Sequence, residues 1–263
     1  MNESFVPGAH GALIPGKAGR LFSYTYTPGG SGKMPVVILC HGFPGKERIM
    51  DLAVYLREQG FCAVTFHYRG SWGSDGSYTL PGCMDDAESV LDWVLSDPFG
   101  CFDTSSIFFL GHSWGGCITS RILAVRPEVK AGVMLMTADM TYLMTELYNA
   151  PEGHDMIHNA FSEGCEWLKD YSIGQMLVEV KAEPERYSMP AYAPAIAGKP
   201  VFVAGGLLDT LISIEGNVRP LAEALAKNPG PAPVVRYYET DHGMNLHREE
   251  IRHDVASFLR SCL

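Results

Sequence analysis

The sequence lacks long hydrophobic runs, and its uninterrupted apolar stretches, such as Val36 to Cys40, have the length of one strand. A helix that crosses a bilayer needs about 20 consecutive apolar residues. Residues 1–20 are polar and rich in glycine and proline, without the apolar core of a secretion signal. We therefore expect a cytoplasmic location and no membrane partner.

Positive charge is also scarce, because 20 Lys and Arg stand against 30 Asp and Glu, for a net charge of −10. Binding to nucleic acid through its phosphates needs a clustered basic surface, and no such cluster stands out in the chain. Seven cysteines are present, but none forms a C-x-x-C pair. An odd number of scattered cysteines, several inside apolar runs, favours buried free thiols in a reducing compartment over a disulfide scaffold.

From residue 34 onward, strand-like apolar runs alternate with helical patterns. The strand-like runs are 34–40, 61–68, 107–110, 130–137, 201–204 and 234–238, and the helical patterns are 51–59, 85–95, 114–125, 214–227 and 245–263. This alternation is typical of βαβ units and predicts an α/β fold with a mostly parallel sheet and helices on both faces. Residues 21–27 alternate in character and predict an antiparallel hairpin at the sheet edge. With 46% hydrophobic residues, we expect one domain over 1–263.

Residues 139–198 interrupt the alternation. The segment is rich in Met, Tyr, Glu and Pro, and it shows helical patterns over 140–148 and 166–180 with breaks at 149–153 and 190–194. Ligands of parallel α/β sheets bind at the end of the sheet where the strands finish. An insertion after a strand is therefore expected to form a helical cap or lid within the single domain.

A serine bracketed by glycines, Gly111-His112-Ser113-Trp114-Gly115, follows the strand 107–110 and precedes the helix 114–125. In this context G-x-S-x-G forms a nucleophile elbow, which holds the serine in a strained conformation and lifts its hydroxyl above the sheet. Side chains at positions 111 and 115 would collide there. The pentapeptide alone fits an ordinary glycine-rich turn equally well.

Residues elsewhere in the chain favour the catalytic interpretation. A serine hydroxyl needs a base to accept its proton, and the base needs a third group to orient it. His242 follows the strand 234–238, and Asp209 follows the strand 201–204. The order Ser113, Asp209, His242 differs from the orders in chymotrypsin-like and subtilisin-like proteases. Asp139, after the strand 130–137, is the alternative acid.

Two backbone N–H groups must also point at the oxygen that gains charge during acyl transfer. Trp114 supplies one, at the start of its helix, where the helix dipole favours negative charge. The second is expected from Phe43, in the loop His41 to Gly45, because glycine at position 42 allows a close approach of the backbone.

These pieces resemble the α/β-hydrolase superfamily, from its esterase and small-acyl-hydrolase branch. The matching motifs are H-G-F-P-G at 41–45, Y-R-G-S-W-G-S-D-G at 68–76, G-H-S-W-G-G at 111–116, G-G-L-L-D at 205–209 and D-H-G at 241–243. The resemblance implies the triad Ser113, Asp209 and His242, no metal or other cofactor, and an acyl-enzyme intermediate. The chain departs from many relatives at Trp114, which is expected to change the pocket wall, and after Asp209, where a proline often found nearby is missing.

The remaining histidines and aromatics allow further expectations. His41 and His112 are expected to make structural hydrogen bonds, and His247 and His253 to be solvated. His154 and His158 form an i,i+4 pair without the Glu and third ligand of an H-E-x-x-H zinc site, so no metal is expected. Substrate contacts are predicted for four residues of the cap and of the 68–76 loop, namely Trp72, Tyr142, His154 and Trp167.

The preferred function is hydrolysis of a small carboxylic ester with a modest acyl or aryl group. A peptidase or amidase is the alternative, with Glu146, Glu152 or Glu163 binding the amino terminus of the substrate. A non-catalytic binding protein is a third interpretation, and the intact set of nucleophile, base, acid and donors argues against it. A homodimer is compatible with the sequence.

Overall fold

The computed structural model describes residues 4–45 and 49–263. Within them, the main sheet has eight strands in the order β10-β9-β8-β7-β5-β6-β3-β2, all parallel except for the antiparallel pairs β2–β3 and β3–β6. The strands are β2 (Gly8–Gly16), β3 (Gly19–Thr27), β5 (Met34–Cys40), β6 (Cys62–Phe66), β7 (Phe102–His112), β8 (Val129–Leu135), β9 (Val201–Gly206) and β10 (Val234–Tyr238). A separate antiparallel pair joins β1 (Ser4–Phe5) to β4 (Gly30–Ser31). The predicted parallel sheet and edge hairpin are confirmed.

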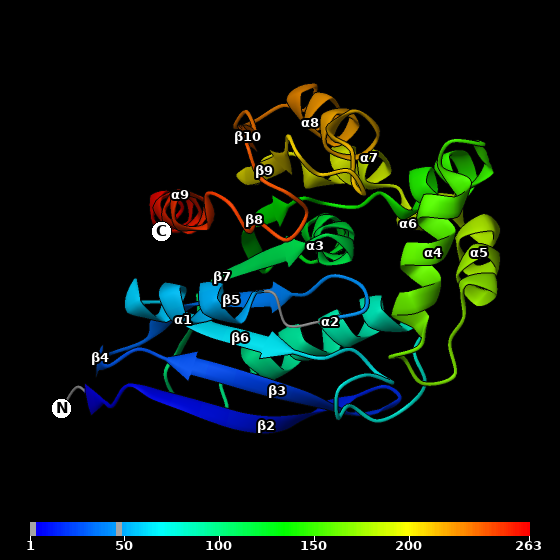
Figure 1. Ribbon diagram of the computed structural model, residues 1–263. Helices are drawn as coiled ribbons and strands as arrows, with labels where there is room; N and C mark the ends of the chain where they lie inside the picture. The colour runs from blue at the N-terminus through cyan, green and yellow to red at the C-terminus, as the bar shows by residue number, and fades with distance from the viewer. Residues whose placement is uncertain (1–3, 46–48) are drawn as a thin grey trace.

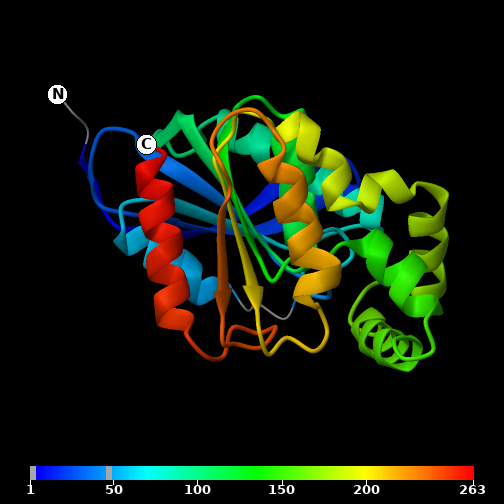
Figure 2. The ribbon, with the colours of Figure 1, turned by 90° about the horizontal axis from the view of Figure 1, so that it is seen from above.

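Helices cover both faces of the sheet (Figures 1 and 2). On one face, α1 (Met50–Glu58) and α9 (Arg248–Ser261) share a hydrophobic cluster with alternate residues of β5, Val37 and Leu39. On the other, β5 contributes Val36 and Ile38 to a cluster with α2 (Leu80–Leu95), α3 (Trp114–Val125) and α8 (Arg219–Ala226). Burial on both faces explains why this strand is continuously apolar.

Residues 139–198 form a helical segment between β8 and β9 that contains no strand among its residues, all of which are described. Its helices α4 and α5 lie beside the main body, on the side away from the C-terminus (Figures 1 and 2). The segment comprises α4 (His154–Cys165), α5 (Ile173–Ala182), α6 (Pro184–Tyr187), α7 (Met189–Tyr192) and the single-turn helices η1 (Tyr142–Glu146), η2 (Leu147–Asn149) and η3 (Ala193–Ile196). A further turn, η4 (Ile214–Val218), precedes α8.

Several element boundaries differ from those expected. β7 begins at Phe102, five residues before the predicted apolar run, because the polar residues 103–106 extend a strand whose start pairs with Met34 and Pro35. α2 begins at Leu80 instead of position 85, since Thr79 caps it by accepting a hydrogen bond from the Gly82 N–H at 3.0 Å. The helical character of α4 was not predicted. Among the described residues, no helix has both the length and the apolar character needed to cross a bilayer.

Candidate active site

Ser113 occupies a sharp turn between β7 and α3. Its φ of 56° and ψ of −122° lie outside the regions that L-residues ordinarily adopt. A Cβ atom at Gly111 would lie 2.0 Å from the carbonyl oxygen of Gly115, and one at Gly115 would lie 2.0 Å from that of Cys40. The predicted crowding around the serine is confirmed, and it explains why both positions are glycine.

The loop after β5 passes directly over the serine. A Cβ atom at Gly42 would lie 2.9 Å from the Cβ atom of Ser113, so only glycine permits this approach. The next residue, Phe43, is held by its side chain, whose ring stacks on Phe161 at 5.2 Å between centroids. Phe43 is the residue for which an oxyanion-binding N–H was predicted, and its loop is thus fixed next to the elbow.

His242 and Asp209 form a close pair at the carboxyl ends of β10 and β9. The Nδ1 atom of His242 lies 2.7 Å from Oδ2 of Asp209, whose side chain is completely buried. The other carboxylate oxygen accepts hydrogen bonds from the N–H groups of Leu211 at 3.0 Å and Ile212 at 2.8 Å. These donors come from the turn in which the proline is missing, so backbone bonds orient the carboxylate there.

Asp139, the alternative acid, has different partners. Its carboxylate accepts hydrogen bonds from the N–H groups of Tyr142 and Met189, both at 2.9 Å. Burial raises the pKa of this carboxyl, against the effect of those bonds. Asp139 therefore joins the two ends of the helical segment, whereas the imidazole of His242 is paired with Asp209.

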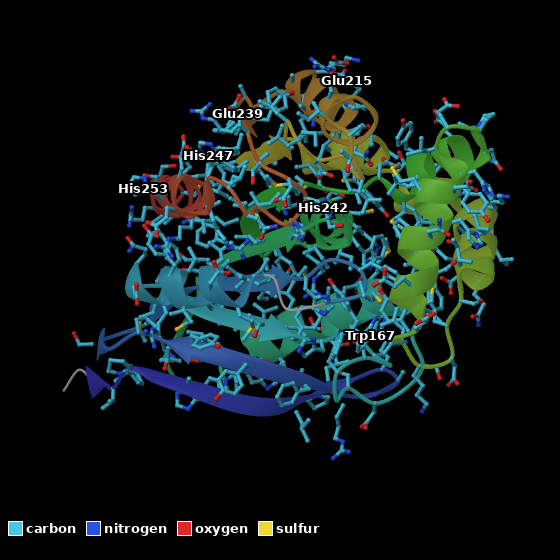
Figure 3. All side chains as sticks on the ribbon, in the orientation of Figure 1. Trp167, Glu215, Glu239, His242, His247 and His253 are labelled. Atoms are coloured by element: carbon cyan, nitrogen blue, oxygen red, sulfur yellow. The ribbon has the colours of Figure 1, made fainter. Side chains whose placement is uncertain are left out.

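His112 connects the elbow to the histidine loop. Its Nε2–H donates to the backbone carbonyl of His242 at 2.8 Å, and the two rings are 4.9 Å apart. His41 is buried and donates from Nδ1 to the Gly42 carbonyl at 2.7 Å. Burial lowers the pKa of His41 to about 3, so the ring is neutral at physiological pH. By contrast, His247, which precedes α9, and His253, within α9, are exposed, as expected (Figure 3).

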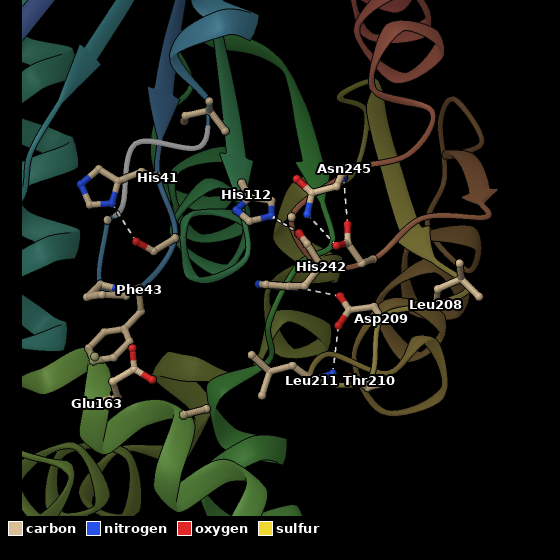
Figure 4. A pocket seen from close by; sticks show the side chains of 18 residues that line it. His41, Phe43, His112, Glu163, Leu208, Asp209, Thr210, Leu211, His242 and Asn245 are labelled. Carbon is tan, nitrogen blue, oxygen red and sulfur yellow. Dashed lines mark hydrogen bonds and ion pairs between the residues drawn. The ribbon is translucent and has the colours of Figure 1, made fainter.

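A cavity of about 460 Å³ lies against the pair His242 and Asp209 and against the loop after β5 (Figure 4). The helical segment contributes one wall through Ala160, Glu163 and Gly164 of α4. The other lining residues are His41, Gly42, Phe43, Pro44, Gly45, Ile49, His112, Leu208, Asp209, Thr210, Leu211, Asp241, His242, Gly243 and Asn245. Ser113 is 7% exposed and is not itself among them, although its neighbours Gly42 and His112 are.

None of the four residues predicted to contact substrate lines this cavity, and those contacts stay predictions. Trp72 and Trp167 instead stack on one another, with centroids 5.7 Å apart. The ring of Tyr142 packs against Gly216, and His154 lies at the first turn of α4 beside Tyr148. Helical periodicity did not indicate which residues of α4 would line the cavity, and these are Ala160, Glu163 and Gly164.

The expectation that Trp114 changes the pocket wall is wrong, because this residue does not line the cavity. Its indole is completely buried and packs near Tyr187, with ring centroids 6.2 Å apart, in the core beneath the helical segment. Only its backbone is in a position to act at the elbow, as the first residue of α3. Leu208, Leu211 and Asn245 line the cavity but were not predicted from the sequence. Leu208 and Leu211 lie within two residues of Asp209, and Asn245 lies two residues after the D-H-G motif.

A family model described as the alpha/beta hydrolase fold matches residues 35–161. The esterase Pf2001 of Pyrococcus furiosus superposes with a TM-score of 0.72 at 20% identity, over 97% of this chain and 91% of that one. The chain has the α/β-hydrolase fold. The region matched by the family model contains the elbow and the loop 41–45, while Asp209 and His242 lie beyond it.

Two curated relatives each align with less than half of the chain. An uncharacterized 31.7 kDa protein of Escherichia coli is 35% identical over 131 residues, which is 48% of this chain and 45% of that protein. The probable aminopeptidase YbaC of Bacillus subtilis is 30% identical over 105 residues, covering 37% of this chain and 32% of that one. The chain thus spans less than half the length of either relative. Among its described residues, no cluster of three or more His, Cys, Asp or Glu could hold a metal ion.

Proposed function

We propose that the protein is a serine hydrolase that cleaves small carboxylic esters through an acyl-enzyme. Ser113 is the nucleophile, His242 the general base and then acid, and Asp209 the group that orients the imidazole and stabilises its protonated form. The backbone N–H groups of Phe43 and Trp114 bind the oxyanion. The helical segment 139–198 acts as the cap over the site.

The observation that carries the proposal is the hydrogen bond between His242 Nδ1 and Asp209 Oδ2 at 2.7 Å. A completely buried carboxylate is costly to maintain unless its charge has a use or a partner. Here it is bound to the one ring nitrogen that must carry a proton if Nε2 is to act as a base. That ring also lies beside His112, the residue next to a serine in elbow geometry.

The reaction follows from these roles. Ser113 Oγ attacks the ester carbonyl carbon while His242 takes the hydroxyl proton, which gives a tetrahedral oxyanion. Collapse of this intermediate breaks the bond to the alcohol oxygen, and the imidazolium returns its proton to the departing alcohol. Water, deprotonated by His242, then attacks the acyl-enzyme and releases the carboxylic acid and the free serine.

The size and lining of the cavity support a small substrate. A volume of about 460 Å³ suits an ester with a short acyl or aryl group. Phe43, Ile49, Leu208 and Leu211 provide apolar wall, while Thr210 and Asn245 provide polar groups. Because the carboxylates of Glu163 and Asp241 also line the cavity, an ester without negative charge is favoured.

The proposal is tested by fluorophosphonate labelling with mass-spectrometric mapping, together with turnover of a panel of p-nitrophenyl esters. We expect labelling of Ser113 and measurable turnover, and we expect Ser113→Ala to lose both while it keeps the thermal unfolding midpoint of the wild type. If the wild type neither labels nor turns over any ester, the enzyme proposal fails. Retained turnover in Ser113→Ala would place the nucleophile elsewhere.

A second candidate function, cleavage of peptides or amides with a free amino terminus, is favoured by the position of Glu163. All three of these glutamates are exposed, but only Glu163 lines the cavity, whereas Glu146 and Glu152 lie outside it. Similarity to a probable aminopeptidase points the same way. If the substrate is an aminoacyl arylamide, Glu163→Gln should raise its KM about tenfold or more and leave p-nitrophenyl acetate unaffected. Glu152→Gln is the matched control, and equal KM values in both variants would exclude a role for Glu163.

A further inference from the structure

We propose that Trp72 is a positioning residue for the oxyanion-binding loop. The proposal rests on the proposed function, because it concerns the Phe43 N–H that would bind the oxyanion. Trp72 lies outside the cavity wall, so its effect on the reaction must pass through a neighbouring group.

A single hydrogen bond connects Trp72 to the loop that carries Phe43. The indole Nε1–H of Trp72 donates to the backbone carbonyl of Pro44 at 3.1 Å. Pro44 directly follows Phe43, so this bond fixes the chain one residue after the proposed donor. Proline has no N–H of its own, and its carbonyl is therefore the only backbone hydrogen-bonding group at position 44 that a neighbour can hold.

Trp72 is itself held in an unfavourable backbone conformation. Its φ of 45° lies in the left-handed region, where bulky residues are rare because the conformation is strained. The surrounding contacts keep it there. Its ring stacks on Trp167 at an interplanar angle of 20°, and the Gly70 carbonyl accepts a hydrogen bond from the Lys169 N–H at 2.8 Å. Nearby, Arg69 forms an ion pair with the buried Asp86 at 2.7 Å.

The loop His41 to Gly45 is packed tightly between Trp72 on one side and α4 on the other. A Cβ atom at Gly45, whose φ is 101°, would lie 2.5 Å from Cε1 of His41 and 3.0 Å from Nε1 of Trp72. On the opposite side, a Cβ atom at Gly164 of α4 would lie 2.3 Å from the ring of Phe43. The side chain of Phe43 is therefore held by α4, and the backbone just after it is held by the indole.

This arrangement predicts a specific kinetic effect. Oxyanion donors act only when they meet the developing charge at hydrogen-bond distance, and small displacements of such groups lower the rate of the chemical step. Loss of the Trp72 N–H would free the Pro44 carbonyl and allow the Phe43 N–H to shift. Because the oxyanion exists only in the transition state and intermediate, the loss should lower kcat and leave KM nearly unchanged.

The experiment compares Trp72→Phe with Trp93→Phe in the full chain. Phenylalanine keeps a ring for stacking on Trp167 but lacks the donor, whereas Trp93 packs against Phe99 and Phe102 in a different part of the molecule. We expect Trp72→Phe to lower kcat on p-nitrophenyl acetate about tenfold with KM within about twofold. Affinity for an aryl trifluoromethyl ketone, which forms a tetrahedral oxyanion adduct, should fall by the same factor as kcat/KM. Trp93→Phe should match the wild type.

A second replacement at position 72 separates loss of the N–H donor from misfolding of Trp72→Phe. Benzothienylalanine at position 72 keeps the shape of the indole and replaces the N–H with sulfur, so it should reproduce the loss of kcat without loss of thermal stability. Unchanged kcat, a raised KM alone, or an equal loss in Trp93→Phe would each overturn the proposal for Trp72. A wild type inactive on all esters would instead overturn the proposed function, and this inference with it.

Discussion

His112 donates a hydrogen bond from its imidazole to the backbone carbonyl of His242, at 2.8 Å. The two residues are 130 positions apart, and one of them directly precedes the elbow serine. The bond therefore links the nucleophile turn to the loop that carries the proposed base. Its geometry requires a proton on Nε2 of His112, because a carbonyl oxygen can only accept.

Replacement of His112 by Phe should test this link. The variant keeps a ring but leaves the His242 carbonyl without its donor, so we expect kcat to fall about tenfold and the free energy of unfolding to fall by about 1–3 kcal/mol. Ester turnover and urea unfolding would measure the two effects. His253→Phe, at an exposed position of α9, should leave kcat unchanged. Wild-type kcat in His112→Phe would show that the bond does not position His242.

Asp209→Asn and Asp139→Asn should separate the two candidate acids. The amide at position 209 favours the wrong tautomer of His242, and in serine proteases the equivalent change lowers kcat by about 10⁴. Asn at position 139 disturbs a carboxylate bound to the N–H groups of Tyr142 and Met189, so we expect lower stability with kcat within about tenfold. The kcat values of both variants, measured on one ester, identify which carboxylate acts as the acid. The reverse pattern would assign the acid role to Asp139.

Gly111→Ala should destabilise the elbow. The new Cβ would lie 2.0 Å from the Gly115 carbonyl oxygen, a contact with backbone that no side-chain rotation relieves. We expect a loss of roughly 3 kcal/mol in the free energy of unfolding, measured in urea, together with loss of turnover. Gly174→Ala in α5 is the control, because its nearest neighbour would be 3.8 Å away, and it should be neutral or gain up to about 1 kcal/mol. Equal stabilities of the two variants would refute the steric argument.

His41 should make stability depend on pH below neutrality. Burial lowers its pKa to about 3 in the folded protein, against about 6.5 in the unfolded chain. Between these values the unfolded chain binds a proton that the folded protein does not. The free energy of unfolding should therefore fall with falling pH by up to about 1.4 kcal/mol per pH unit, and this contribution should vanish above pH 6.5.

Urea unfolding of the wild type and of His41→Gln, at several values between pH 4.5 and 7.5, would measure this slope. The variant is expected to be less stable at pH 7.5 but to lose less stability on acidification than the wild type does. Identical slopes for the two proteins would mean that other groups account for the acid sensitivity.

Local patterns were sufficient to predict the sheet, the elbow and the pairing of His242 with an acid that follows a strand. β5, α3 and β10 begin and end where the apolar periodicity predicts. The start of β7 could not be predicted in this way, because residues 103–106 are polar and belong to the strand only through pairing with the neighbouring chain segment. The start of α2 did carry a signal in Thr79 and Pro81, a capping residue followed by proline in the first turn.

The cavity wall was beyond the reach of local patterns, since it depends on how α4 is rotated against the loop after β5. Contact between Gly164 and the ring of Phe43 sets that rotation, and no spacing within α4 encodes the position of Phe43. The indole of Trp114 is a similar case. Its place next to the serine indicated a pocket wall, whereas the first turn of α3 directs it into the core near Tyr187.

The loops at the carboxyl ends of the strands and the helix α4 contribute different parts of the site, and this has a consequence for engineering the protein. The turn that carries Ser113, the proposed nucleophile, and the loop that passes over it contain Gly42, Gly111 and Gly115, where an added Cβ atom would collide with neighbouring atoms. On α4, Gly164 is equally constrained by Phe43, but Ala160 and Glu163 face the same cavity without a comparable restriction. Substitutions confined to these two positions should therefore change the cavity wall and leave the backbone conformation of the Ser113 turn unchanged.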